Sequence, residues 1–168
     1  IDKRSSLLKK YIILNESKLV RLFNSKKMKF KNKDLKNDTS IEIPSITNFF
    51  MLFADLNDNK INKGLIKSLK KYYKNEKYFF PSISSNHKSF EEKRYWRGPV
   101  WVNCNWIIYQ GLKNKDKKFA EILRKKTINL VEKKNFREYF SCKSGLGMGA
   151  KNFSWTAALY LDFKLNRS

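Results

Sequence analysis

Two segments in the second half of the chain carry residue types that could do chemistry. The first runs Tyr95-Trp96-Arg97-Gly98-Pro99-Val100-Trp101, so that two tryptophans flank an arginine and a proline able to open a helix. Flat aromatic rings can pack against the C–H faces of sugars, and an arginine can donate several hydrogen bonds to hydroxyls or to a carboxylate. The segment therefore fits a carbohydrate site, although buried helical tryptophans and a surface ion pair of Arg97 would explain it as well.

The second segment, Phe136-Arg137-Glu138-Tyr139-Phe140, places a single carboxylate among aromatic residues. A carboxyl group in such surroundings can have a shifted pKa, which makes Glu138 a candidate acid or base. The competing interpretation is a structural ion pair between Glu138 and Arg137 or a lysine. The glycine-rich stretch that follows, residues 144–150, does not match a dinucleotide-binding fingerprint, because no strand is expected before it.

Cofactor chemistry finds no support in the sequence. Cys104 and Cys142 are too few for a disulfide scaffold and give no paired metal spacing. The single histidine, His87, lies in a polar stretch and is better explained as a solvent-facing or hydrogen-bonded loop residue than as a catalytic one. We therefore expect neither a metal site nor an organic cofactor.

Together, the motifs resemble glycoside hydrolase family 63, and most of all its bacterial mannosylglycerate and glucosylglycerate hydrolases. The resemblance rests on the two segments above, on Asn105-Trp106, on Phe153-Ser154-Trp155-Thr156 and on the loop Pro81-Ser82-Ile83-Ser84. It covers about residues 44–166. The resemblance implies an (α/α)6 toroid of twelve helices with the active site at one end. It also implies inverting hydrolysis of α-glycosidic bonds without a cofactor.

The resemblance also assigns roles to individual residues. Glu138 matches the general base, which activates a water molecule. The sugar pocket would be lined by the first segment and by a tryptophan further along the chain: Tyr95, Trp96, Arg97, Gly98, Trp101 and Trp155. We expect the tryptophans and the arginine of the first segment to converge with Glu138 on one concave surface. Because a base must be ionised, we also expect a cation, Arg97 or Arg137, close to Glu138.

One part of the family pattern is missing. The general acid of these enzymes is an aspartate in a Gly-Trp-Asp-like or Gly-Met-Asp-like segment far upstream of the base, and residues 1–95 contain no such segment. Asp55 and Asp58 lie in an ordinary helix-to-turn stretch. Since the chain begins with Ile1 and carries about six helices, we expect residues 1–168 to be the C-terminal half of the catalytic domain. Its partner would be the missing N-terminal half, and the chain alone would be inactive.

Hydrophobic periodicity predicts the elements that must position these residues. Apolar residues recur at helical spacing over residues 5–23, 49–56, 61–72, 100–112, 119–131 and 154–165. Thr47 or Asn48 could cap the second of these helices and Asp116 the fifth. No stretch alternates like a strand, and residues 24–40 are expected to be an exposed connection. The expected fold is therefore all-α and built of helical hairpins, with an exposed apolar patch on the first helix, which faces the missing half.

The charge of the chain suggests a nucleic-acid partner only at first sight. Its 168 residues include 37 Lys and Arg against 15 Asp and Glu, a net charge of +22. Nucleic-acid sites favour arginine and cluster their cations, whereas only seven of these 37 are arginine and the cations are spread along the whole chain. No apolar run is long enough to span a bilayer. We therefore expect a carbohydrate substrate, no nucleic-acid or membrane partner, and a cytoplasmic location.

Three alternatives stay open at this point. The chain could belong to another (α/α)6 carbohydrate enzyme, of trehalase or debranching type, although the Pro-Ser-x-Ser loop favours family 63. It could be a basic all-α module that binds nucleic acid or acidic glycans, in which case its affinity would fall steeply with salt. It could also be an inactive remnant, which the missing acid would explain.

Overall fold

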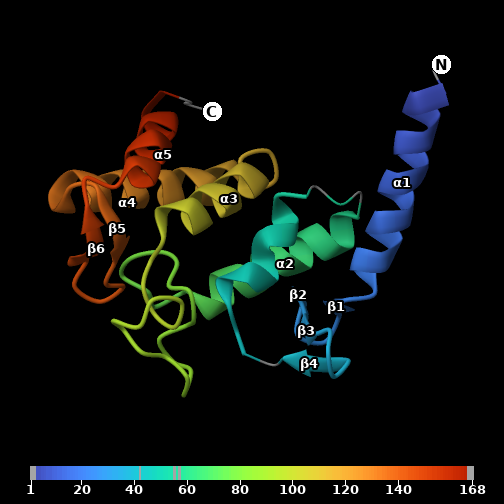
Figure 1. Ribbon diagram of the computed structural model, residues 1–168, viewed down its shortest axis with the longest axis horizontal. Helices are drawn as coiled ribbons and strands as arrows, with labels where there is room; N and C mark the ends of the chain where they lie inside the picture. Colours follow the sequence, from blue (N-terminus) through green and yellow to red (C-terminus); the bar gives the residue numbers. More distant parts are fainter. Residues whose placement is uncertain (1–2, 42, 55, 57, 166–168) are drawn as a thin grey trace.

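The computed structural model describes residues 3–41, 43–54, 56 and 58–165, and this part of the chain is predominantly helical (Figure 1). It contains five α-helices and one 3-10 helix: α1 Lys3–Val20, η1 Ile46–Leu52, α2 Asn59–Tyr72, α3 Val102–Leu112, α4 Lys117–Lys134 and α5 Ser154–Leu165. It also contains three antiparallel hairpins: β1 Phe23–Asn24 with β2 Lys29–Phe30, β3 Asn32–Asp34 with β4 Thr39–Ile41, and β5 Arg137–Phe140 with β6 Gly147–Lys151. The order of the helices follows the prediction. Asp55 lies outside the described residues.

The hydrophobic core lies where η1, α2, α3 and α4 meet. Each element contributes side chains with no accessible surface: Leu52, Leu65, Leu69, Ile108, Leu112 and Leu123. Gly111 allows α3 to approach η1 closely, because a Cβ atom at this position would lie 2.5 Å from the carbonyl carbon of Leu52. None of the described helices is both long and apolar enough to cross a membrane.

Polar side chains set the starts of the helices. Asp116 caps α4 by accepting a hydrogen bond from the N–H of Phe119, which confirms the predicted cap. The prediction for η1 was wrong: its cap is Ser45, and Asn48 is the third residue of the helix. The Asn48 side chain accepts from the N–H of Ser45, which completes a reciprocal capping box.

Helix α3 begins later than the sequence predicts. The predicted start was residue 100, one residue after Pro99, whereas the helix begins at Val102. The reason is that Val100 is extended and forms bridges with Pro81 on one side and Phe140 on the other. Its N–H and carbonyl are both bonded to Phe140, at 2.7 and 2.9 Å, so they cannot join a helix.

The hairpins correct the prediction that the chain has no strands. Residues 24–40 were expected to be an exposed connection, yet they include most of two hairpins, and Lys29 and Phe30 in β2 are buried. The ring of Phe30 packs on Phe23 at 5.3 Å, and its carbonyl accepts a hydrogen bond from the Asn48 amide. Strands of two or three residues are too short to show alternation.

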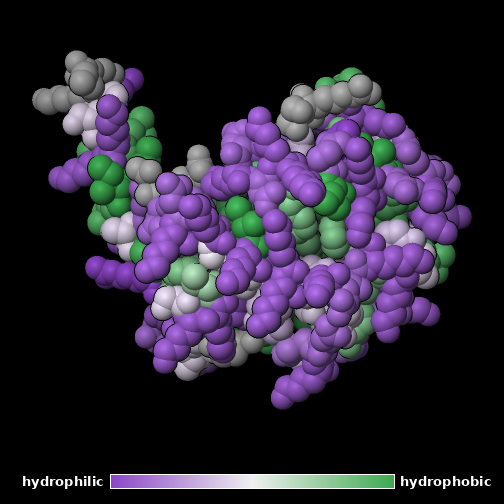
Figure 2. All heavy atoms as spheres, turned by 180° about the vertical axis from the view of Figure 1, so that it is seen from behind, coloured by the Kyte–Doolittle hydropathy of each residue, from purple (hydrophilic) through white to green (hydrophobic). Residues whose placement is uncertain are grey.

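Helix α1 stands apart from the rest of the molecule (Figure 1). It exposes six large apolar or aromatic side chains: Leu7, Leu8, Tyr11, Ile12, Ile13 and Leu14. Figure 2 shows green, hydrophobic spheres on the projecting arm. This confirms the apolar patch predicted for the first helix. A contiguous apolar surface of this kind marks a place where another surface packs.

Candidate active site

Main-chain pairing brings the two candidate segments side by side. Val100, in the first segment, pairs with Phe140, at the end of β5. Pro81 pairs with Val100 from the other side, and the N–H of Ser82 donates to the carbonyl of Pro99. Thr156 of α5 donates to the carbonyl of Arg137 and so holds the start of β5. The convergence of the two segments therefore follows from a backbone frame.

Four rings from these segments form one cluster, which we call the aromatic cluster: Tyr95, Trp96, Trp101 and Tyr139. Trp101 lies in the middle, stacked on Trp96 at 4.2 Å and on Tyr139 at 5.0 Å, and only 2% of it is exposed. Trp96 is 45% exposed and forms the outer layer. Of the two tryptophans, Trp96 therefore offers the open ring face, and Trp101 supports it from behind.

The carboxylate of Glu138 is held by two hydrogen-bond donors at the edge of this cluster. The hydroxyl of Tyr95 donates to Oε1 at 2.7 Å, and the N–H of Ala150 donates to Oε2 at 3.0 Å. The indole N–H of Trp101 in turn donates to the carbonyl of Tyr95. The hydrogen bond to Glu138 raises the pKa of Tyr95, because the phenol must keep its proton to donate. Each carboxylate oxygen thus has a fixed partner.

The prediction that Arg97 or Arg137 lies close to Glu138 was wrong, because both guanidinium groups bind other partners. Arg97 turns towards its own loop, where its Nη2 lies 2.9 Å from Oε1 of Glu91 and its Nε donates to the carbonyl of Ser89. Arg137 donates through Nη2 to the carbonyl of Gly149. Among the described residues, no cation forms an ion pair with Glu138. The contacts that hold its carboxylate are therefore the two hydrogen bonds from Tyr95 and Ala150.

Gly98 and Trp155 lie at the margins of the site. Gly98 is buried, and its N–H donates to the hydroxyl of Ser82. A Cβ atom at Gly98 would lie 2.2 Å from the carbonyl oxygen of Glu91, so this glycine permits the close loop packing that presents Trp96. Trp155 is 47% exposed in the first turn of α5, and the ring nearest to it is Phe153 at 6.4 Å. Trp155 is thus outside the aromatic cluster.

Sequence reasoning missed the backbone partner of the carboxylate. The N–H of Ala150 reaches Glu138 because β5 and β6 pair, and this hairpin was not predicted. The sequence signal that could have indicated the hairpin is the glycine at position 149. In the structure Gly149 adopts a left-handed φ of +68° beside the carboxylate. A glycine with this conformation is typical of hairpins with an irregular register.

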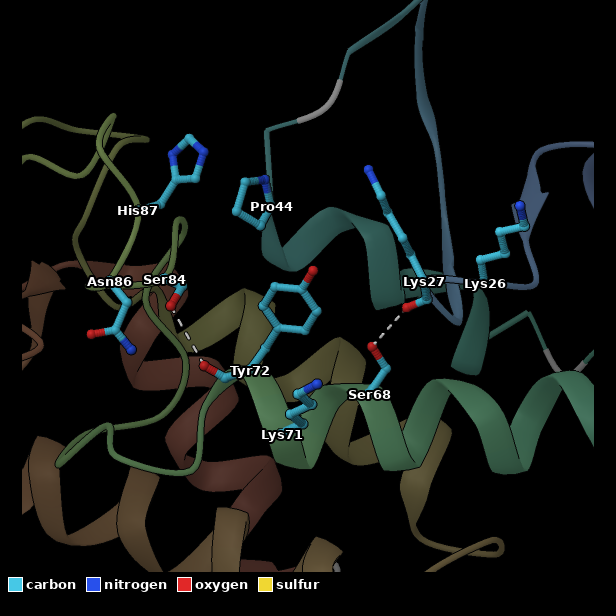
Figure 3. Close-up of a pocket in the computed structure, with 9 residues that line it drawn as sticks. All are labelled: Lys26, Lys27, Pro44, Ser68, Lys71, Tyr72, Ser84, Asn86 and His87. Atoms are coloured by element: carbon cyan, nitrogen blue, oxygen red, sulfur yellow. Dashed lines mark hydrogen bonds between the residues drawn. The ribbon is translucent and has the colours of Figure 1, made fainter.

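His87 lies in a different pocket and confirms the interpretation as a hydrogen-bonded loop residue. Its Nδ1 accepts from the N–H of Ser89 at 3.1 Å. The pocket, of about 440 Å³, lies between α2, the turn from β1 to β2, Pro44 and the loop that carries His87 (Figure 3). Tyr72 projects into it, while the hydroxyls of Ser68 and Ser84 donate to main-chain carbonyls. None of the predicted site residues lines this pocket.

The comparisons with known proteins match this architecture. The family model of the mannosylglycerate hydrolase MGH1-like glycoside hydrolase domain matches residues 9–156. The chain belongs to this family. Within it, the mannosylglycerate hydrolase of Thermus thermophilus is 31% identical over 157 residues, which are 92% of this chain and 37% of that protein.

Solved structures agree on the fold. The crystal structure of a family 63 mannosylglycerate hydrolase from Thermus thermophilus, in complex with glucose, matches with a TM-score of 0.86 and 29% identity, over 94% of this chain and 41% of that one. The neutral trehalase of Saccharomyces cerevisiae matches with a TM-score of 0.72 at 14% identity, over 98% and 31%, and so shows the fold alone. The fold of the chain is therefore part of the (α/α)6 toroid. The chain spans little more than a third of the Thermus hydrolase.

The glycine beside the carboxylate yields a first prediction. Gly149→Ala is expected to destabilise the chain by about 1–2 kcal/mol, because a side chain is disfavoured at its positive φ. It also displaces Glu138, since the new Cβ atom would lie 2.4 Å from Oε2. Urea unfolding measures the first effect. Gly149→Asn is the matched variant, because asparagine tolerates the left-handed conformation but brings the same Cβ atom. If Asn restored both stability and the position of Glu138, steric contact would not be the cause.

Proposed function

We propose that this chain is the C-terminal half of the catalytic domain of an inverting α-glycosidase, with Glu138 as the general base. The substrate class is an α-glucoside or α-mannoside, of which mannosylglycerate, the compound named for the relatives, is the first to test. Trp96 supplies the exposed aromatic surface for the sugar ring. The remaining contacts to the substrate come from the missing N-terminal half of the barrel.

One observation supports the proposal above the others: a carboxylate fixed by two donors lies at the edge of an aromatic cluster. The two hydrogen bonds fix the direction of the Glu138 carboxylate, as a base that must accept a proton from a positioned water requires. Two segments about forty residues apart in the sequence contribute to this arrangement. The competing interpretation, a structural ion pair of Glu138 with a cation, would require neither the aromatic cluster nor the two donors.

The chemistry that we propose is a single displacement. Glu138 takes a proton from a water molecule as the oxygen of that water attacks the anomeric carbon. The bond from this carbon to the glycosidic oxygen breaks, and a carboxylic acid on the opposite face protonates the departing oxygen. In inverting enzymes the two carboxyl groups are about 6.5–9.5 Å apart, which leaves room for the water.

We propose that the second carboxyl group comes from outside these 168 residues. The reason lies in the sequence, since residues 1–95 contain no segment that matches the family's general acid. The test compares two proteins, each assayed on mannosylglycerate and on glucosylglycerate. One is the 168-residue chain alone, and the other, the joined protein, also contains the residues encoded directly upstream of Ile1. Hydrolysis is expected only from the joined protein. Rapid hydrolysis by the 168-residue chain alone would refute the assignment.

The hydroxyl of Tyr95 gives a prediction that is specific to the positioning of the base. Tyr95→Phe keeps the ring in the aromatic cluster and removes the hydrogen bond to Glu138. Because this hydrogen bond positions the base, and a misplacement of about 1 Å can cost about 100-fold in rate, kcat is expected to fall by about 10- to 100-fold in the joined protein. Measuring kcat and KM separately distinguishes this loss from weaker sugar binding.

Tyr160→Phe is the matched control for this variant. Tyr160 also donates its hydroxyl to a glutamate, Glu132 on α4, at 3.0 Å. The control therefore removes the same kind of hydrogen bond from a tyrosine that is not part of the aromatic cluster. We expect it to leave kcat within twofold of the parent value. Equal losses of kcat in both variants would mean that Tyr95 acts only through general stability.

A further inference from the structure

A second pocket lies beside the β5–β6 hairpin, and its lining is strongly cationic. It has a volume of about 540 Å³ and lies between the end of α4 and the two strands. Four of its nine lining residues are cations and none is an acid: Lys133, Lys134, Arg137 and Lys151. Neither Glu138 nor any ring of the aromatic cluster lines this pocket. The pocket is therefore distinct from the candidate active site.

The register of the hairpin makes this charge unusual. Arg137 and Lys151 are cross-strand partners, and like charges directly opposite each other destabilise a sheet. Lys133 and Lys134 have an ordinary explanation, because cations in the last turn of a helix interact favourably with its dipole. That explanation does not cover Arg137 and Lys151. A bound anion would convert their repulsion into a shared attraction.

The side chain of Arg137 is held in place before any ligand arrives. Its Nη2 donates to the carbonyl of Gly149 at 3.0 Å. Its stem packs so closely on Gly147 that a Cβ atom there would lie 2.2 Å from Cγ of Arg137. Its Nε, by contrast, is buried and has no hydrogen-bond acceptor among the described residues. Buried donors are normally paired, and an anion beside the guanidinium is an acceptor of the right charge.

We propose that this pocket binds a phosphate group. A guanidinium flanked by ammonium groups matches the several oxygens and the double charge of phosphate better than it matches a single carboxylate. Free phosphate and the phosphate of a small sugar ester share this chemistry. The pocket of Figure 3 is a weaker candidate, because its lining contains no arginine and two of its hydroxyls already donate to the main chain.

The test titrates the 168-residue chain with inorganic phosphate, and separately with a hexose monophosphate, at constant ionic strength. Amide chemical shifts identify the site and give the dissociation constant. Shifts are expected at Arg137 and Lys151, and Lys151→Gln should weaken phosphate binding by at least tenfold. Tighter binding of the ester than of free phosphate would identify a sugar phosphate as the natural source; the reverse order would identify phosphate itself.

The net charge of +22 demands a control for non-specific attraction. Lys67→Gln removes the same charge from an exposed position on α2 that does not line the pocket. It is expected to change the dissociation constant by less than twofold. Equal weakening by the two variants, or shifts spread over the whole surface, would overturn the proposal. Amide spectra of both variants also show whether each one is folded.

Discussion

Replacing Glu138 by glutamine is expected to abolish hydrolysis in the protein that joins this chain to the rest of its domain. The glutamine side chain has the same shape and can still accept from Tyr95, but it cannot take a proton from water. General-base catalysis contributes about 10²–10⁴-fold, so kcat should fall by about a hundredfold to ten-thousandfold. Sugar binding, measured by calorimetry with the intact substrate, should change little. This difference is the signature of a catalytic group rather than a binding group.

The matched control is Glu132→Gln. Glu132 also accepts a hydrogen bond from a tyrosine, and Lys164 pairs with it at 2.6 Å on the surface between α4 and α5. The substitution removes the same charge from a carboxylate that has no role in the proposed reaction. Activity is expected to stay within twofold of the parent. Full activity of Glu138→Gln would mean that another carboxylate is the base.

The largest loss of stability is expected from Asn105→Ala. Asn105 is fully buried at the start of α3 and connects three segments. Its Oδ1 accepts from the N–H of Phe80 at 2.7 Å, and its Nδ2 donates to the carbonyl of Phe79 and to the hydroxyl of Thr127 on α4. Alanine leaves the N–H of Phe80 buried without a partner. The expected cost is about 3–5 kcal/mol, which lowers Tm by roughly 10 °C or more.

Chemical unfolding followed by tryptophan fluorescence measures this cost. Asn114→Ala is the control, because Asn114 is exposed in the turn between α3 and α4. It should change the free energy of unfolding by less than about 0.5 kcal/mol. A cost of less than about 1 kcal/mol for Asn105→Ala would mean that water replaces the lost hydrogen bonds.

Much of the frame around the site could be predicted from the sequence. The cap at Asp116 and the bounds of α5 follow from local signals that act within one turn of helix. The first segment and Glu138 could be linked only through the family resemblance, since no local signal spans the interval between them. The structure explains the link by the pairing of Val100 with Phe140.

The remaining features depend on non-local contacts. Trp96 and Trp101 have the same residue type in the same segment, yet one is exposed and the other is buried. The difference arises because Tyr139 and Trp96 cover both faces of Trp101. The orientation of Arg97 is decided by Glu91, a neighbour that loop closure brings near. Helical periodicity contains no information about such contacts.

The isolation of α1 has a consequence for how the chain folds. This helix of 18 residues makes few contacts with the other described elements, and a helix without tertiary packing is only marginally stable in water. We therefore expect two cooperative units in the chain, the helix α1 and a body centred on α3. A single free energy of unfolding describes only the body, while α1 can lose and regain its structure locally. Its order becomes coupled to the docking of the proposed N-terminal half, so the helical content of α1 reports on assembly of the toroid.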